Sequence, residues 1–178
     1  MCGISGYLDL EQGVNPQVLQ QMNDIIVYRG PDDEGYALIG AEHCTFCKGQ
    51  DTIPEVALPP LNQTDCSPYF LGFGHRRLSI VDLSANGHQP MAMPERGLVV
   101  TYNGEIYNYI ELREELTSLG YTFQTTSDTE VLLYAYCQWG EDCLTHFNGM
   151  WGFALWDSAE KKLFCARDRL GAKPLHYY

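Results

Sequence analysis

The chain has 178 residues, and its content of 45% hydrophobic, 12% aromatic and 19% charged residues is typical of a folded globular domain rather than a disordered one. Its formal net charge of −12 argues against nucleic acid and anionic membranes as partners, because both are polyanions. No apolar run approaches the ~20 residues that a membrane span needs. Seven cysteines without a secretory signal before them predict reduced thiols and a cytoplasmic protein.

The first predicted elements are strands around one helix. A strand is expected over residues 2–8, and the apolar side chains of 16–26 recur at helical spacing. The sequence Arg-Gly-Pro-Asp-Asp at 29–33 ends that helix, because proline disfavours helix at the residue before it, and a strand follows around 36–39. Residues 41–69 contain four prolines and three cysteines, so we expect an irregular surface insertion there.

The rest of the chain predicts more strands and two further helices. Strands on both sides of helices, without regular βαβ alternation, favour an α+β fold over a doubly wound sheet. We interpret residues 1–178 as one domain. The strands are expected over 71–75, 98–102, 149–156 and 163–167, the last two as a hairpin, and the helices over 112–119 and after the capping-box sequence 127–130.

The cysteine at position 2 is the most informative single residue. Methionine aminopeptidases remove Met1 when the next side chain is as small as that of cysteine, and processing would leave a thiol and a free α-amine on Cys2. The amine could take and return the thiol proton, so Cys2 is a candidate self-activated nucleophile. The alternative is an ordinary packing cysteine. A retained Met1 would acylate the α-nitrogen and remove its basicity.

Polar groups recur beside glycines or helix starts later in the chain. One of two arginines at the end of a strand, Arg76 or Arg77, could hold a carboxylate through a two-point fork. The side-chain amide of Asn103 and the N–H of Gly104 are the parts of an oxyanion hole, and the carboxylate of Glu105 follows them.

Each of these groups also has a simpler interpretation. Arg77 could form a surface ion pair, and Asn103-Gly104 is a common type I′ turn sequence. Asp128 could meet a substrate ammonium, but a carboxylate in the first turn of a helix is also favoured by the helix dipole alone. Single motifs therefore leave the function open.

The order of the motifs along the chain is more specific. They are Met-Cys-Gly-Ile at 1–4, Arg-Gly-Pro-Asp at 29–32, His-Arg-Arg-Leu-Ser-Ile at 75–80, Tyr-Asn-Gly-Glu-Ile-Tyr-Asn at 102–108, Ser-Asp-Thr-Glu at 127–130, Phe-Asn-Gly-Met-Trp-Gly-Phe-Ala at 147–154 and Arg-Asp-Arg-Leu-Gly at 167–171. Together they resemble the glutaminase domain of the class II glutamine amidotransferases, and most closely that of the glutamine-hydrolysing asparagine synthetases. The resemblance leaves out only about 41–69.

This resemblance implies a fold and a reaction. The fold is a four-layer αββα sandwich of two antiparallel sheets between helices, as in the N-terminal nucleophile hydrolases. In the implied reaction, Cys2 attacks the side-chain amide of L-glutamine, ammonia leaves, and water releases glutamate from a thioester.

The family pattern also implies roles for individual residues. Arg77 would hold the substrate α-carboxylate, while Glu105 and Asp128 would receive its α-ammonium. Asn103 and the Gly104 N–H would stabilise the oxyanion. Part of the pocket would come from Leu78, Ile80 and Val81.

For cofactors and partners, the resemblance implies no cofactor and no metal in this domain. ATP and Mg would serve only an ATP-dependent synthetase domain or subunit that receives the ammonia, and residues 1–178 do not include one. A homodimer is a further expectation. The alternatives are an amidotransferase domain serving another acceptor such as a sugar, a non-catalytic regulatory domain of the same fold, and a zinc-binding module that uses His43, Cys44, Cys47 and Cys66.

Overall fold

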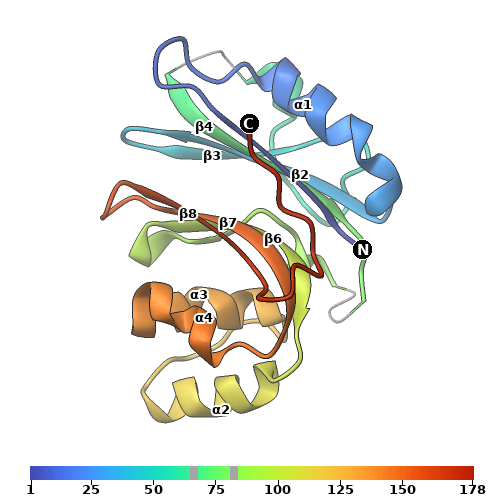
Figure 1. The fold of residues 1–178 in the computed structure, drawn as a ribbon. Helices are drawn as coiled ribbons and strands as arrows, with labels where there is room; N and C mark the ends of the chain where they lie inside the picture. Colours follow the sequence, from blue (N-terminus) through green and yellow to red (C-terminus); the bar gives the residue numbers. More distant parts are fainter. Residues whose placement is uncertain (65–67, 81–83) are drawn as a thin grey trace. The chain divides into compact units, whose positions relative to one another are not determined.

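The computed structural model describes residues 1–64, 68–80 and 84–178, and in it the chain forms two units. The first unit comprises residues 1–79 with 88–90, and the second comprises 80–87 with 91–178. Within the described residues each unit is built on one four-stranded sheet in which all neighbouring strands are antiparallel (Figure 1). This arrangement confirms the predicted α+β class.

The first unit packs one helix against its sheet. The strand order is β1-β4-β2-β3, and α1 contacts β4 and β1. The helix begins at Pro16, where the preceding Asn15 side chain accepts a hydrogen bond from the N–H of Gln17. The elements are β1 (Gly3–Leu8), α1 (Pro16–Ile25), β2 (Asp33–Gly40), β3 (Cys44–Lys48) and β4 (Tyr69–Arg77), with 3-10 turns at Val27–Arg29 and Leu61–Gln63.

The expectation of an irregular surface insertion over 41–69 is wrong for part of that segment. Residues 44–48 form the edge strand β3, which pairs with β2. Cys47 and Leu61 are buried and belong to the core cluster of this unit. The Cys-Thr-Phe-Cys-Lys run holds no proline, and its strand partner is supplied by the tertiary fold. Replacing 44–64 by a short linker would therefore remove a strand and core residues.

The second unit places its helices on one side of its sheet (Figure 1). The strand order is β5-β6-β7-β8, α3 packs on β5 and β6, and α2 packs on α3. The elements are β5 (Met91–Met93), β6 (Leu98–Ile106), α2 (Tyr109–Ser118), α3 (Asp128–Trp139), α4 (Cys143–His146), β7 (Gly149–Asp157) and β8 (Lys162–Arg167), with 3-10 turns at Ala85–Gly87, Pro94–Arg96 and Gly140–Asp142.

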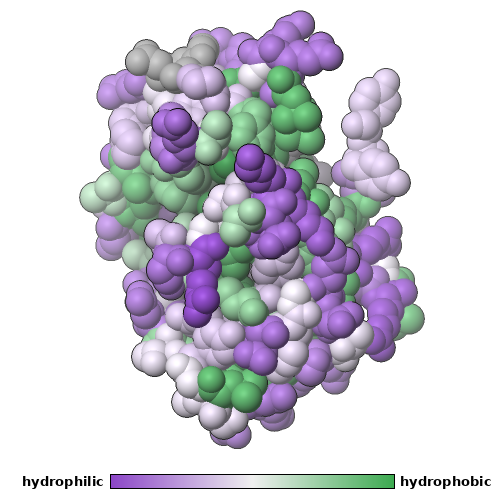
Figure 2. Space-filling model, turned by 90° about the vertical axis from the view of Figure 1, so that its left-hand side faces the viewer, coloured by the Kyte–Doolittle hydropathy of each residue, from purple (hydrophilic) through white to green (hydrophobic). Residues whose placement is uncertain are grey.

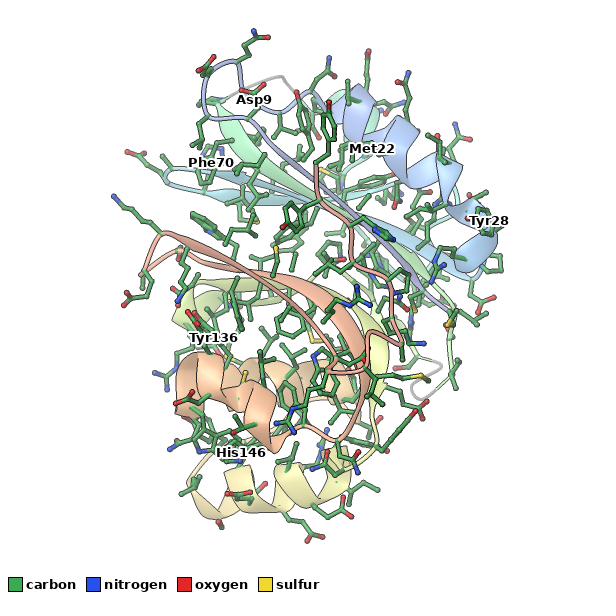
Figure 3. The ribbon with its side chains drawn as sticks, viewed as in Figure 1. Asp9, Met22, Tyr28, Phe70, Tyr136 and His146 are labelled. Carbon is green, nitrogen blue, oxygen red and sulfur yellow. The ribbon has the colours of Figure 1, made fainter. Side chains whose placement is uncertain are left out.

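The core of the second unit lies between the sheet and α3. Tyr136, labelled in Figure 3, extends from α3 toward the sheet, where its ring stacks on Phe164 and its hydroxyl donates to Asp157 Oδ2 at 3.2 Å. The buried cluster consists of apolar side chains from the sheet and the helices, and its largest members include Tyr102, Leu116, Leu132, Phe147, Trp151 and Phe153.

Local sequence signals fix the ends of the helices. Gly120 follows α2 with a φ of 99°, a conformation that favours glycine. Ser127 caps α3, because its side chain accepts from the N–H of Thr129 at 3.0 Å. This is an N-cap bond to the second helical residue, and the Glu130 side chain does not complete the predicted capping box. The Glu130 carboxylate instead accepts from the N–H groups of Gln124 and Thr125, at 2.8 and 2.7 Å.

The face of the molecule shown in Figure 2 carries both hydrophilic and hydrophobic residues. Among the described residues no helix combines the length and the apolar character needed to cross a membrane.

Candidate active site

The thiol of Cys2 lies at the end of β4. Its Sγ is 3.4 Å from the Leu78 nitrogen, which donates to it, and 3.6 Å from the Leu78 carbonyl oxygen, which accepts from the thiol. Cys2 immediately precedes β1, and the next residue, Gly3, pairs with Arg76 of β4. Pairing of the first strand with β4 thus brings the candidate nucleophile beside the predicted substrate-binding residues 77 and 78.

Arg29 also positions the first residues, a role that the sequence did not reveal. Its Nε donates to the carbonyl oxygen of Cys2 at 3.0 Å. The adjacent Gly30 packs so closely on β4 that a Cβ there would lie 2.3 Å from the Arg76 carbonyl oxygen. We interpreted 29–33 as a helix stop and 29–32 as one motif of the family resemblance, without a role for Arg29, and no local signal points to a contact 27 residues away.

The structure distinguishes the two arginines of β4. Arg76 is buried on the side of the sheet that α1 covers, where it binds Asp24 of α1 and Glu34 of β2. Because side chains alternate along a strand, Arg77 faces the opposite side, and it is only 6% exposed. The surface ion pair considered for Arg77 is therefore wrong, and the assignment of the carboxylate clamp to Arg77 rather than Arg76 stays a prediction that this geometry favours.

His75 shares the face of Arg77. The pKa of the His75 imidazole is lowered to about 3, chiefly by burial, with smaller contributions from electrostatic interactions with His88 and Arg77, whereas Asp33 opposes the shift. At neutral pH the imidazole is therefore uncharged. Arg77 therefore contributes a positive charge to this face, whereas His75 beside it contributes none.

The remaining predicted pocket residues of this segment are less defined. Leu78 is half-buried, whereas Ile80 is 65% exposed and belongs to the second unit. Val81 lies outside the described residues. The pocket roles of these three residues stay predictions.

In the second unit, Asn103, Gly104 and Glu105 lie within strand β6. Their pairing partners are Gly152, Trp151 and Met150 of β7, so the type I′ turn considered for Asn103-Gly104 is wrong. A Cβ on residue 104 would lie 2.5 Å from the Met150 carbonyl oxygen, which explains the glycine.

Strand pairing also sets the direction of the Gly104 N–H. In an antiparallel ladder, alternate residues direct their backbone groups toward opposite neighbours. The N–H of Tyr107 donates to the carbonyl oxygen of Asn148, the residue just before β7. The N–H of Ile106 points the other way and donates to the Asp128 carboxylate. Gly104 lies two residues before Ile106, so its N–H points to the same side of β6 as the Ile106 N–H. On that side, β5 pairs with β6 only as far as Val100. The Gly104 N–H therefore points toward the Asp128 edge of β6, as an oxyanion donor requires.

Asp128 ties the start of α3 to this edge. Its Oδ2 accepts from the Tyr102 hydroxyl at 2.7 Å and from the Ile106 N–H at 3.1 Å, and the residue is 7% exposed. Burial raises the pKa of the Asp128 carboxyl, those two hydrogen bonds oppose the rise, and the charge of Glu105 adds to it. Asp128 is thus more than a helix-dipole charge, since it joins two elements next to Glu105.

Asp168 supports the strand opposite Gly104, another role that the sequence did not reveal. Its carboxylate accepts from four backbone N–H groups, and these bonds lower the pKa of Asp168 against the opposing effect of burial. Trp151, the partner of Gly104, donates to this carboxylate and accepts from the Asp168 N–H at 2.8 Å. The four donors are Trp151, Leu170, Ala172 and Lys173.

The candidate residues therefore form two groups. The first unit brings together Cys2, Arg77 and Leu78, and the second brings together Asn103, Gly104, Glu105 and Asp128. Within the described residues, no group of three or more His, Cys, Asp or Glu side chains could hold a metal ion. Cys66, one of the predicted zinc ligands, lies outside them.

Comparison with solved structures defines the class of the fold. The chain is similar to the glutamine phosphoribosylpyrophosphate (PRPP) amidotransferase from B. subtilis complexed with ADP and GMP, with a TM-score of 0.69 and 24% identity over 94% of this chain and 36% of that one. A structure of the allosteric regulatory enzyme of purine biosynthesis gives a TM-score of 0.73 and 24% identity over 98% of this chain and 38% of that one. The chain shares the fold of the matched parts of these two structures, in keeping with the two-sheet α+β fold that the sequence predicted.

The chain belongs to the glutamine amidotransferase domain family, whose model matches residues 64–178. It is 40% identical to asparagine synthetase [glutamine-hydrolyzing] 3 of Bacillus subtilis over 99% of this chain and 25% of that protein. It is 36% identical to putative asparagine synthetase [glutamine-hydrolyzing] 2 of Methanocaldococcus jannaschii over 100% of this chain and 32% of that protein. The class II resemblance is confirmed, and the chain spans about a quarter to a third of the length of these relatives.

Proposed function

We propose that this domain hydrolyses L-glutamine to glutamate and ammonia, with Cys2 as the nucleophile. The observation that carries the proposal is the position of the Cys2 thiol, held by the backbone of Leu78 next to the buried Arg77, in a chain of the glutamine amidotransferase family. A guanidinium beside a thiol can fix an amino acid by its carboxylate while the thiol reaches the side-chain amide.

The proposed reaction has two steps. Once Met1 is removed, the α-amine of Cys2 accepts the thiol proton as sulfur attacks the amide carbon, and it returns that proton to the departing ammonia. A γ-glutamyl thioester remains, in which Cys2 Sγ is bonded to the former amide carbon, Cδ. Water then attacks the thioester, and glutamate leaves as the thiol is restored.

The family pattern assigns further roles in this reaction to residues of the second unit. The Gly104 N–H and the Asn103 amide would donate to the oxyanion of each tetrahedral intermediate. The carboxylates of Glu105 and Asp128 would pair with the substrate ammonium. A molecule lacking either the carboxylate or the ammonium would leave charges of the site unpaired, and this would select for an amino acid.

The direct test is glutamate release from protein shown by mass spectrometry to have lost Met1. We expect activity in the processed protein, none in Cys2→Ala and very little in Cys2→Ser, because oxygen is the poorer nucleophile. The analogue 6-diazo-5-oxo-L-norleucine should alkylate Cys2 alone. Full activity in Cys2→Ala, or a label on another residue, contradicts the proposal. A processed protein with the fold but no activity would instead favour a regulatory domain.

For the ammonia acceptor, we propose an ATP-dependent amidation of the asparagine-synthetase type on a further domain or a separate chain. The support is the description of the relatives at 40% and 36% identity as glutamine-hydrolysing asparagine synthetases. ATP and Mg would act there, and glutamine hydrolysis would need no cofactor. Incubating the whole gene product with ATP, Mg, glutamine and either aspartate or a sugar phosphate identifies the acceptor by its amidated product.

The proposed location is the cytoplasm, and the proposed assembly includes a homodimer. The cysteines described by the structure are free thiols, which supports a reducing compartment. Fractionation of cells and sedimentation of the whole gene product test these two proposals.

A further inference from the structure

Arg76 connects four separate parts of the first unit. Its Nε donates to the carbonyl oxygen of Asn23, its Nη2 lies 2.6 Å from Asp24, and its Nη1 lies 2.6 Å from Asp51. Glu34 is the remaining partner, at 3.3 Å from Nη2. The guanidinium, only 2% exposed, therefore links β4 to α1, to β2 and to the segment 49–53 that follows β3.

The segment 49–53 is itself attached to the start of β2. The Asp51 N–H donates to the Glu34 carboxylate at 2.9 Å, and the Thr52 hydroxyl donates to the Glu34 carbonyl oxygen at 2.5 Å. The Ile53 N–H donates to the Asp33 carboxylate at 3.1 Å. Gly49 lies so close that a Cβ there would be 2.1 Å from the Glu34 carboxylate. This segment thus caps the charged cluster around Arg76.

The backbone next to Arg76 carries the proposed site. Arg77 follows directly, and its carbonyl oxygen accepts from the Asp32 N–H at 3.0 Å. The next residue, Leu78, holds the Cys2 thiol through its N–H and carbonyl groups. A shift of the β4 end would therefore move the carboxylate clamp most, because Cys2 is held by Arg29 as well as by Leu78.

We propose that Arg76 is a positioning residue for the glutamine site, which holds the end of β4, and with it Arg77 and Leu78, against α1 and the segment 49–53. This inference rests on the proposed function. Arg76 itself faces away from Arg77 and does not touch the substrate. Its two half-exposed partners, Asp24 and Asp51, are 53% and 54% exposed, so they can be neutralised singly without leaving a buried charge unpaired.

The test compares Asp24→Asn, Asp51→Asn and the double variant with the parent in the Met1-processed protein. The substrates are L-glutamine and 4-aminobutanamide, which lacks only the α-carboxylate. We expect each single variant to raise KM for glutamine by about threefold, and the double variant by more than about tenfold because the two carboxylates share Arg76, with kcat within about twofold. The preference for glutamine over 4-aminobutanamide should fall by the same factors, because only glutamine uses Arg77.

The matched control is Glu141→Gln. Glu141 is also 54% exposed and pairs with Lys162, but both residues lie in the second unit. We expect its KM and its preference to equal those of the parent. Equal losses on both substrates in the double variant would show a merely structural role and overturn the proposal.

A second measurement does not depend on activity. Backbone hydrogen exchange in peptides covering residues 74–79 should be at least about tenfold faster in the double variant and unchanged in Glu141→Gln. Unchanged exchange in the double variant overturns the positioning role. A parent without glutaminase activity contradicts the proposed function, while the exchange result still decides whether Arg76 fixes the end of β4.

Discussion

The two groups of candidate site residues are held by different forces. Around Arg77 the end of β4 is fixed by charged side chains, since Arg76 binds three carboxylates from separate elements. Around Gly104 the site strand is fixed by pairing with β7, and the carboxylates of Asp128 and Asp168 accept mainly backbone N–H groups. A charge cluster depends most on its buried members, here Arg76 and Glu34, because a buried unpaired charge is costly, whereas a ladder of backbone bonds loses one contact at a time.

The largest expected effects separate the chemical roles of the two groups. Asn103→Ala should lower kcat for glutamine hydrolysis by about 100-fold to 1,000-fold with little change in KM, because an oxyanion donor strengthens as charge develops. Arg77→Ala should raise KM far more than it lowers kcat, because a carboxylate clamp acts in the ground state and the transition state alike. Steady-state kinetics on processed protein measure both.

The control for this pair is a circular dichroism spectrum and a melting curve for each variant. Equal changes of KM and kcat in both variants would show that at least one role is wrongly assigned.

The second prediction compares how much a substitution in each group lowers the free energy of unfolding. Arg76→Met leaves Glu34, itself 1% exposed, as a buried carboxylate without its cationic partner. We expect the free energy of unfolding to fall by about 3 kcal/mol. This value is at the lower end of the losses usually caused by breaking a buried ion pair, because Asp24 and Asp51 are half-exposed. Asp168→Asn should cost less, since an amide oxygen still accepts part of the same hydrogen bonds. Urea titration measures both losses, and a larger loss in Asp168→Asn would contradict the comparison.

The third prediction concerns acid stability of the first unit. The pKa of His75 is lowered by burial to about 3, whereas an unfolded histidine has an ordinary pKa near ~6.5. Protons therefore bind the unfolded chain first. The stability that depends on neutral His75 is complete above pH ~6.5 and is lost as the pH falls from there toward 3.

His75→Leu should flatten the dependence of the unfolding free energy on pH between about 6.5 and 3. His176→Gln, a change at an exposed histidine, should leave the slope as in the parent. Chemical denaturation at a series of pH values tests this, and an unaltered slope in His75→Leu would refute the assignment.

The smallest predicted effect concerns the helix that carries Asp128. Ser127→Ala removes the acceptor for the Thr129 N–H and should lower the free energy of unfolding by about 1 kcal/mol. Ser127→Asp keeps an acceptor and should retain most of the stability. A loss in the Asp variant as large as in the Ala variant would show that the cap does not account for the serine.

Local patterns in the sequence predicted the elements well because those patterns act over a few residues. The apolar spacing before residue 26, the Ser127 cap and the β7–β8 hairpin all appear where they were expected. Two local interpretations were wrong. Residues 44–48 form a strand because β2 offers a partner, and Asn103-Gly104 is extended because β7 pairs along it. In both, long-range pairing outweighed local preference.

The sequence by itself determined the family, and it predicted the candidate nucleophile Cys2 and the residues of the candidate site, because the order of its motifs is specific. Only the tertiary structure decided which arginine of 76 and 77 serves the charge cluster, since strand alternation and the position of α1 set their faces. It alone revealed Arg29, Asp51 and Asp168 as supports of the site. Each has a partner that is distant in the chain, namely Cys2, Arg76 and Trp151, at 17 to 27 residues, beyond the reach of any local pattern.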